Sequence, residues 1–392
     1  MSQQLISRSA DLKRLRDEGY GIEIRAGYLL TKDVPYVDSH KQVKLGTLVS
    51  ELTLAGDITA PPSTHVAFFV GDHPCNDDGS KLTKIEHGSA PQQLDQDLTI
   101  HHSFSAKPLS GRYNDYYEKV TTYVAIITAS AQVIDPKITA RTFSVIASEK
   151  AESVFNYIDT ASSRAGINLA TQRLERGRVG IVGLGGTGSY VFDLVAKTPV
   201  KEIHLFDGDD FLQHNAFRSP SAPSIDQLSA RQKKVDYFKD LYSKMRRGIF
   251  AHPYYINHSN VDQLREMDSI FLCLDLGEPK KVIVDNLEAF GASFIDVGMG
   301  VDLLNGTLRG VVRVTTSIPE QREHFRKRVS LADAHVNNDY DHNIQIADLN
   351  ALNAALAVIK WKKLWGFYLD LENENYTTYT IDGNMLLNAD HS

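Results

Sequence analysis

The chain has 392 residues, a formal net charge of -7 at pH 7 and a pI near 6.1. This length exceeds the size at which one hydrophobic core keeps growing, so two domains are expected. An acidic balance without a long run of Lys or Arg gives no indication of a nucleic-acid partner.

Membrane insertion and a zinc framework are not expected either. No segment approaches the roughly 18 consecutive apolar residues that span a bilayer, and the N-terminal residues contain no apolar secretory core. We therefore expect a cytoplasmic protein without a membrane partner. Cys75 and Cys273 are the two cysteines, too few for a four-cysteine zinc site within one chain, so no structural zinc is expected.

Residues 1–147 are expected to form a smaller α+β module. Residues 9–19 predict a short helix that Ser9 starts and Gly19 stops. Strand-like runs separated by Pro, Gly, Asp and Asn clusters follow, up to Ser105. Residues 113–134 then carry apolar side chains at helical spacing.

Residues 148–392 are expected to form an α/β domain. From Val179 onward strands and helices alternate, which is typical of a Rossmann-like, mostly parallel sheet with flanking helices. The expected strands are 179–182, 202–207, 252–257, 269–275 and 293–298. The expected helices are 190–196, 228–245 and 279–290.

The segments around this alternating region have their own patterns. Residues 143–175 are mostly helical in pattern. After Gly300 the sequence predicts, in order, a ribbon at 306–316, a charged irregular stretch at 318–342, a long amphipathic helix at 344–365 and a closing strand at 376–383.

A glycine-rich turn follows the first strand of this domain. Gly183, Gly185 and Gly188 have the GxGxxG spacing, and Gly186 adds a fourth glycine, which is costly unless something lies against the backbone. The helix after the turn, with Ser189 in its first turn, offers free amides and a partial positive charge to a phosphate. This turn fits a dinucleotide enzyme, a methyltransferase or an ATP user, and a purely structural turn is the alternative.

Charged residues after the second strand narrow these choices. Asp207 lies 19 residues beyond Gly188, where a carboxylate can accept hydrogen bonds from ribose hydroxyls in either NAD or ATP. Asp209, Asn215 and Arg218 follow, and Lys234 opens a predicted helix. Alternatively, these charged side chains lie on the solvated surface. For Lys234 this alternative is stronger, because the run RQKK contains a second lysine next to it.

In this order the elements resemble the E1-like adenylating family, which includes activators of the ThiF, MoeB and HesA type. The residues that carry the resemblance extend over about 164–367 and are Gly183, Gly185, Gly186, Gly188, Ser189, Asp207, Asp209, Asn215, Arg218, Gln232, Lys234 and Asp275. The resemblance implies that Asp207 holds the ribose of ATP. It also implies that Asn215, Arg218 and Lys234 contact the phosphates and that Asp275 holds Mg²⁺.

The implied reaction is ATP-dependent adenylation of the C-terminal carboxylate of a ubiquitin-like or sulfur-carrier protein, which releases pyrophosphate. The resemblance further implies a homodimer and an E2-like or other downstream transfer protein. The long helix at 344–365 has the apolar face that a dimer would require. Arg164, on a preceding helix, is a candidate phosphate contact in its own or a partner subunit's site, and an exposed helix charge is the alternative.

The chain departs from the family at its cysteines. No cysteine lies between Thr315 and Asp341, where many ubiquitin-activating relatives carry a catalytic one. Cys75, in an expected exposed turn beside His73, is a candidate acyl acceptor, and a small residue that fills the turn is the plainer reading. The His- and Asp-rich stretch at 331–342 is expected to be a charged loop and not a metal cluster.

Other functions stay open at this point. An NAD-dependent oxidoreductase shares the glycine turn and Asp207 but predicts no role for Arg218, Lys234 or Asp275. A non-catalytic nucleotide-binding scaffold and a dehydratase that acts on a tRNA carboxylate are further alternatives. Residues 1–147 resemble an extension found in bacterial gene sets built around ubiquitin-like proteins, and we expect them to recruit a partner or substrate.

Overall fold

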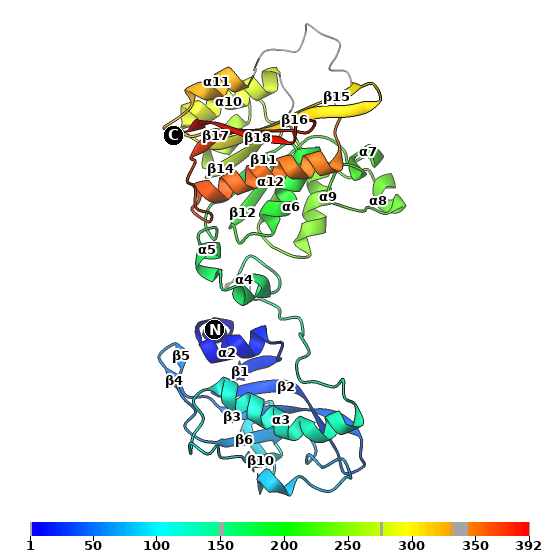
Figure 1. Ribbon diagram of the computed structural model, residues 1–392, viewed down its shortest axis with the longest axis vertical. Helices are drawn as coiled ribbons and strands as arrows, with labels where there is room; N and C mark the ends of the chain where they lie inside the picture. Colours follow the sequence, from blue (N-terminus) through cyan, green and yellow to red (C-terminus); the bar gives the residue numbers. More distant parts are fainter. Residues whose placement is uncertain (1, 149–152, 275–276, 330, 332–343, 392) are drawn as a thin grey trace. The chain divides into compact units, whose positions relative to one another are not determined.

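The computed structural model describes residues 2–148, 153–274, 277–329, 331 and 344–391 (Figure 1). The chain divides into two compact units, Met1–Ser148 and Glu149–Ser392. The second unit has the expected α/β architecture with a mostly parallel sheet, and the first is a smaller unit of helices packed on an antiparallel sheet. Asp275 and most of the charged stretch at 331–342 lie outside the described residues.

The N-terminal unit is built on a six-stranded sheet with the strand order β1-β2-β3-β6-β10-β7, in which every neighbouring pair is antiparallel. Its helices are α1 (Ser2–Arg8), α2 (Ala10–Asp17) and α3 (Tyr116–Ile134). Its sheet strands are β1 (Ile22–Arg25), β2 (Tyr28–Val37), β3 (Val43–Glu51), β6 (Val66–Val70), β7 (Glu86–Gly88) and β10 (His102–Ser105). Smaller elements are β4 (Leu54–Ala55), β5 (Ile58–Thr59), η1 (Thr83–Ile85), β8 (Gln92–Asp95) and β9 (Leu98–Ile100).

Helix α3 packs across this sheet and begins at a side-chain cap. The carboxylate of Asp115 accepts a hydrogen bond of 2.8 Å from the backbone N–H of Glu118, which satisfies one free amide of the first turn. Tyr116 and Tyr123 are fully buried on the sheet side of α3. The Tyr116 hydroxyl donates to the Glu51 carbonyl at 2.8 Å, so an aromatic ring and a hydrogen bond together fasten the helix to β3.

A lysine lies in the same buried layer. Lys119 is fully buried, and its ammonium donates to the carbonyl oxygens of Thr64 and Val66 at 3.0 and 2.8 Å. Burial lowers the pKa of Lys119 to about 8, and the charge of the Glu51 carboxylate opposes this shift only in part. The folded state therefore binds this proton less tightly than the unfolded chain does.

We expect the unfolding free energy of the N-terminal unit to rise by about 2 kcal/mol from about pH 7.5 to about pH 9.5. The sign follows because the pKa of Lys119 is lowered on folding, so the unfolded chain binds more protons in this range. The free energy of unfolding is measured in urea on the full chain. A short proteolysis pulse at each urea concentration shows which of the two units has unfolded. Lys119→Met should remove most of the rise, and an equally steep rise in that variant would contradict the assignment.

The C-terminal unit contains an eight-stranded sheet with the order β13-β12-β11-β14-β15-β16-β17-β18. The strands from β13 to β15 are parallel and those from β15 to β18 are antiparallel. The strands are β11 (Arg178–Val182), β12 (Glu202–Phe206), β13 (Ile249–His252), β14 (Ser269–Leu272), β15 (Phe294–Leu304), β16 (Thr307–Ser317), β17 (Glu374–Thr380) and β18 (Met385–His391). The chain order reverses between β11 and β14, which makes their carboxyl ends the topological switch point.

Helices cover both faces of this sheet (Figure 1). On one face α6 (Gly186–Ala196), α9 (Lys234–Ser243) and α12 (Ala347–Leu364) share a core with the sheet residues Val179, Ile181 and Phe271. On the other face η2 (Val261–Glu266), α10 (Glu278–Phe290) and α11 (Glu323–Arg328) pack on Val182, Leu272 and Phe294. The remaining helices are α4 (Thr160–Arg164), α5 (Asn168–Gln172), α7 (Gln213–Ala216) and α8 (Ile225–Ser229).

Several predicted elements differ from the structure. Within 143–175 only α4 and α5 are helical among the described residues, because helical spacing in a segment with few buried side chains does not hold a continuous helix. The strand predicted at 252–257 is found earlier in the chain, as β13, in which four residues pair with β12. Pro253 directly follows and ends the strand, because proline has no N–H to donate. The predicted helix at 228–245 is two helices, α8 and α9, separated at Ala230–Lys233.

The apolar face of α12 does not support the dimer argument that the sequence suggested. Ala354, Ala357 and Trp361 on that face are buried against α6 and the sheet of the same unit. The inward packing uses the apolar stripe within one chain, so the stripe is not available as an exposed dimer surface. Several elements were not predicted, among them the N-terminal helix α1, the edge strand β18 and the helix α11, which lies within the stretch expected to be irregular.

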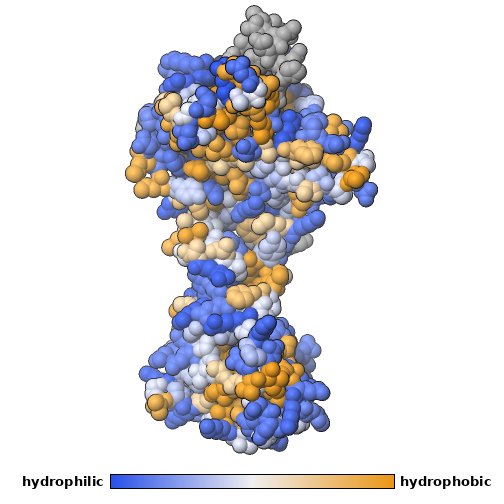
Figure 2. Space-filling model, turned by 45° about the vertical axis from the view of Figure 1, so that its right-hand side comes forward, coloured by the Kyte–Doolittle hydropathy of each residue, from blue (hydrophilic) through white to orange (hydrophobic). Residues whose placement is uncertain are grey.

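On the face that Figure 2 shows, hydrophobic side chains gather in separate patches between hydrophilic ones. Exposed apolar residues on strands β15, β16 and β18 include Leu303, Leu308, Leu386 and Leu387. Across the described residues, no helix combines the length and the apolar character needed to cross a membrane.

Candidate nucleotide site

The predicted site residues gather at the carboxyl edge of the parallel strands. Val182 at the end of β11 lies in register with Phe206 at the end of β12 and with Leu272 at the end of β14. The glycine turn follows β11 directly, and Asp207 follows β12. Ligands of open α/β sheets bind in the crevice at this switch point, so the fold brings the two motifs to the expected place.

Two glycines of the turn are required by close backbone contacts. Gly183 has φ +89°, and a Cβ there would lie 2.5 Å from the Cys273 carbonyl oxygen. A Cβ at Gly188 would lie 1.9 Å from the Gly183 carbonyl oxygen. By contrast, a Cβ at Gly185 would meet no atom within 4 Å. The first two glycines therefore serve the turn itself, and Gly185 presents bare backbone to open space, as a phosphate contact requires.

Ser189 does not offer its hydroxyl to a ligand. Its side chain is fully buried, and its Oγ donates to the Gly186 carbonyl at 2.7 Å within the same helix. The hydroxyl is engaged within the helix because it satisfies a helix carbonyl, and the predicted place of Ser189 in the ATP site stays a prediction. What α6 contributes is its N-terminal end, where the helix dipole favours an anion.

Asp207 is buried with its carboxylate held by two backbone amides. One oxygen accepts from the N–H of Leu184 at 2.6 Å and the other from the N–H of Asp209 at 2.8 Å. The first bond ties the end of β12 to the glycine turn. A carboxylate oxygen has room for more than one donor, so ribose hydroxyls can still bind here, and Asp207 also fixes the shape of the turn.

Lys234 is the first residue of α9 and points into the site. It is 6% exposed, and its ammonium lies 2.6 Å from Asp209 and 3.7 Å from Asp207. Lys233 instead pairs with Asp210 and with the Gly208 carbonyl, and its side chain is 43% exposed. The structure thus resolves the ambiguity in the RQKK run, because only Lys234 combines burial with a position beside the two aspartates.

Tyr255, after β13, completes this charged group and was not predicted. Its hydroxyl donates to Asp209, and its ring covers Gly208, where a Cβ would lie 2.8 Å from the ring. Burial opposes ionisation of Asp209, but the hydrogen bonds from Lys234 and Tyr255 hold its pKa below the ordinary value. The hydrogen bond to Asp209 raises the pKa of Tyr255 to about 12, so the hydroxyl remains a donor. The sequence signal for this contact was Gly208, because only a residue without a side chain leaves room for the Tyr255 ring.

Asn215 and Arg218 lie on and beside the short helix α7. The side-chain oxygen of Asn215 accepts from the N–H of Leu212 at 2.8 Å, so this buried residue also caps α7 and leaves its amide group as a donor. The Nε of Arg218 is buried and has no hydrogen-bond partner within the described part of the chain. A buried guanidinium donor without a partner is costly, and a phosphate contact by Arg218 stays a prediction.

Two predicted site residues, Asp275 and Arg164, have no contact with this group of side chains among the described residues. The segment that carries Asp275 begins after Leu274 and lies outside them, so its role stays a prediction. Arg164 is the last residue of α4 and is exposed. A phosphate contact by Arg164 in a partner subunit also stays a prediction.

Cys75 does not lie in an exposed turn, and this part of the prediction is wrong. The residue is 2% exposed and pairs with both Val37 and Lys81 in short β-bridges. Its thiol donates to the His73 carbonyl at 3.3 Å, while the His73 ring faces Pro74 and Glu86. Burial raises the pKa of the Cys75 thiol, which disfavours the reactive thiolate.

We therefore expect Cys75→Ser to keep adenylation and any subsequent transfer within about twofold of the unmodified chain. The reason is that this thiol is neither ionised nor accessible. Pyrophosphate exchange and product formation measure the effect, and Cys273→Ser serves as the matched control. A loss of transfer with intact exchange in Cys75→Ser alone would restore the acyl-acceptor role.

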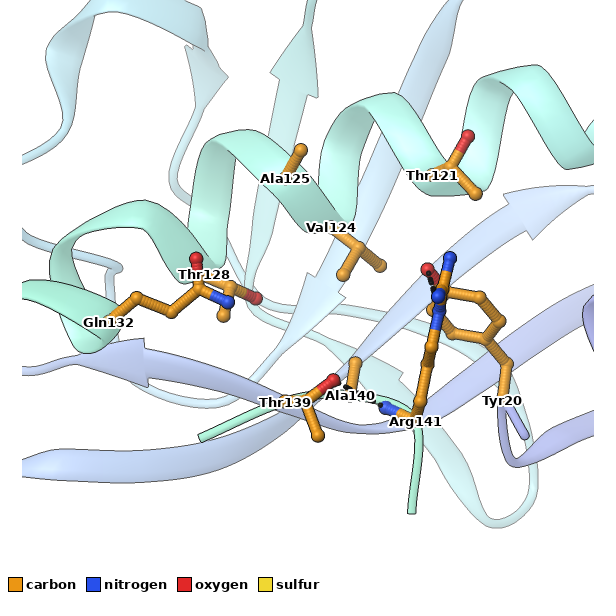
Figure 3. A pocket seen from close by; sticks show the side chains of 9 residues that line it. All are labelled: Tyr20, Thr121, Val124, Ala125, Thr128, Gln132, Thr139, Ala140 and Arg141. Carbon is orange, nitrogen blue, oxygen red and sulfur yellow. Dashed lines mark hydrogen bonds between the residues drawn. The ribbon is translucent and has the colours of Figure 1, made fainter. Parts of the chain in front are cut away.

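A hollow of about 300 Å³ lies in the N-terminal unit between α3 and residues 139–141 (Figure 3). Thr121, Thr128 and Gln132 line it from α3, and Arg141 lines it from the opposite side, where its Nε donates to the Tyr20 hydroxyl at 3.3 Å. None of the predicted nucleotide-site residues lines this hollow.

Comparison with known families places the two regions separately. Residues 10–160 match the model of a domain of unknown function, DUF6791, and residues 160–357 match the model of the ThiF family. The chain belongs to the ThiF family. This membership confirms the resemblance drawn from the glycine turn, Asp207, Arg218 and Lys234, and it supports ATP-dependent adenylation of a peptide or protein carboxylate in general.

Solved structures with a related fold include E. coli MccB with ATP, which is 18% identical, with a TM-score of 0.44 and coverage of 59% of this chain and 70% of that chain. E. coli MccB with MccA-N7isoASN is 18% identical, with a TM-score of 0.45 and coverage of 57% and 67%. PaaA is 16% identical, with a TM-score of 0.43 and coverage of 57% and 75%. No curated protein matches the chain.

Proposed function

We propose that this ThiF-family chain activates the C-terminal carboxylate of a ubiquitin-like or sulfur-carrier protein by adenylation. The carboxylate attacks the α-phosphorus of ATP, an acyl-adenylate forms, and pyrophosphate leaves. The observation that carries the proposal is the buried, unpartnered Nε of Arg218 beside a glycine turn, together with Lys234 at the same sheet edge. A dinucleotide site needs the turn and Asp207 but has no need for these two cations.

The described site residues have different proposed roles in the reaction. Asp207 and the bare backbone at Gly185 orient the ribose and the phosphate chain. Negative charge grows on the phosphate oxygens during attack, and fixed donors such as Arg218 and Lys234 stabilise it without reorganising. Lys234 pairs with Asp209, so a phosphate group would compete with Asp209 for the ammonium.

We further propose that Mg²⁺ binds with ATP. Magnesium at nucleotide sites is usually held by one or two carboxylates and by phosphate oxygens, so it does not need a preformed protein cage. Within the described residues, which do not include Asp275, no group of three or more potential metal ligands occurs. Asp275 is the proposed carboxylate, and the metal would neutralise phosphate charge.

The proposed partners follow from the same reaction. The carrier protein supplies the carboxylate, and an E2-like or other downstream protein accepts the activated group. We propose that the N-terminal unit recruits one of them, that the chain acts as a homodimer and that it works in the cytoplasm, where ATP is available. No described cysteine supports a thioester step, because Cys75 is buried and burial also raises the pKa of the Cys273 thiol.

ATP–pyrophosphate exchange with candidate carrier proteins tests the proposal. Exchange is expected with a carrier that ends in a free carboxylate, and it should be absent with the same carrier amidated at its C-terminus. Nucleotide binding without exchange for any carboxylate would favour the non-catalytic scaffold. NADH formation without exchange would favour the oxidoreductase.

A further inference from the structure

Helix α12 reaches the nucleotide site from the far end of the unit's sequence. Asn350, in its first turn, is fully buried, and its side-chain oxygen accepts from the Thr187 hydroxyl at 3.0 Å. Its side-chain nitrogen donates to the Arg218 carbonyl at 3.3 Å. One amide side chain therefore joins the glycine turn to the backbone of the residue that carries the unpartnered guanidinium.

The fit of α12 against the turn is close. A Cβ at Gly186 would lie 2.0 Å from the Asn350 side-chain nitrogen, so glycine is needed there to admit this amide. Gln345, just before α12, adds a second contact, since its side-chain oxygen accepts from the Gly186 N–H at 3.3 Å. These contacts account for the fourth glycine of the turn, which the GxGxxG spacing alone does not require.

We infer that Asn350 is a positioning residue for nucleotide phosphates, which rests on the proposed function of the site. It holds the Arg218 backbone and the start of α6 at a fixed separation, so that the guanidinium and the helix amides face the same anion. Asn350 itself need not touch the nucleotide. Its effect should depend on the phosphate groups, because the ribose contact at Asp207 is held independently by Leu184 and Asp209.

The test compares ATP and adenosine binding to the full chain by isothermal titration. Asn350→Leu should weaken ATP binding about tenfold or more, as expected for two lost hydrogen bonds, and leave adenosine binding within about twofold. The matched control is Asn353→Leu, since Asn353 is equally buried one turn further along α12 but donates to the Gly298 carbonyl. That control should keep the ratio of the two affinities.

Two milder variants keep the test decisive if Asn350→Leu does not fold. Thr187→Val removes only the hydroxyl that donates to Asn350, and Asn350→Ala removes both hydrogen bonds without adding a charge or a larger apolar side chain. Each should lower ATP affinity several-fold without changing adenosine affinity, and Thr187→Val should add little to Asn350→Leu. Equal losses for ATP and adenosine would overturn the inference while the nucleotide site stands. An unmodified chain that binds ATP no better than adenosine would overturn the proposed function as well.

Discussion

Arg218→Met is expected to lower kcat/KM for pyrophosphate exchange about 100-fold to 1000-fold, the usual cost of removing one preorganised donor from a developing negative charge. The buried Nε of Arg218 has no hydrogen-bond partner among the described residues, so we expect it to donate to a phosphate oxygen of ATP. Exchange kinetics at several ATP concentrations measure the effect. A fall in kcat larger than the rise in KM would indicate that the contact strengthens in the transition state.

Two controls accompany this substitution. Lys233→Met removes the same charge beside the site but from a side chain that pairs with Asp210, and it should change exchange less than about threefold. Arg218→Lys keeps the charge and loses the planar fork, so it should recover only part of the activity. Equal activity of Arg218→Met and Lys233→Met would remove Arg218 from the site.

Gly188→Ala and Gly185→Ala are expected to fail in different ways. A methyl group at position 188 would lie 1.9 Å from the Gly183 carbonyl oxygen, so we expect the C-terminal unit to lose about 3 kcal/mol of unfolding free energy. A methyl group at position 185 meets nothing within 4 Å and should cost less than about 1 kcal/mol. The same methyl group should nevertheless weaken ATP binding strongly, because it occupies the opening over the backbone.

Thermal unfolding and ATP titration of both variants separate the two effects. The expected pattern is an unstable Gly188→Ala and a stable Gly185→Ala that binds ATP poorly. A stable Gly185→Ala with normal ATP affinity would show that phosphates do not approach the turn at that glycine. A substitution of Asp209 or Lys234 could not separate stability from ATP binding in this way, because it would change the charge and the packing of the site together.

The order of motifs and the fold class were predictable from local patterns. The alternation of strands with helices predicts a parallel sheet, and chain order then places the turn after β11 and Asp207 after β12 at one edge. The place of Lys234 at a helix start agrees with α9, although the predicted helix at 228–245 began six residues earlier. Boundaries were less predictable, as at β13, where apolar spacing continues past the last paired residue.

The side-chain partners within the site were not predictable. Ser189 has the residue type and position of a phosphate ligand, but its hydroxyl bonds a helix carbonyl. Cys75 has the sequence context of an exposed turn, but bridges to Val37 and Lys81 bury it. In both cases a local hydrogen bond or strand pairing outweighs the composition of the segment.

Local sequence patterns were enough to predict a nucleotide site and to identify the family, because glycines, aspartates and cations at defined spacings are local chemical requirements of a phosphate turn. Which side chains there have partners depends on the tertiary packing. It paired Lys234 with Asp209, left the Nε of Arg218 unpartnered and brought Asn350 from 163 residues away to Thr187. Contacts at such separations depend on how α12 packs on α6 and the sheet, and no local pattern encodes that packing.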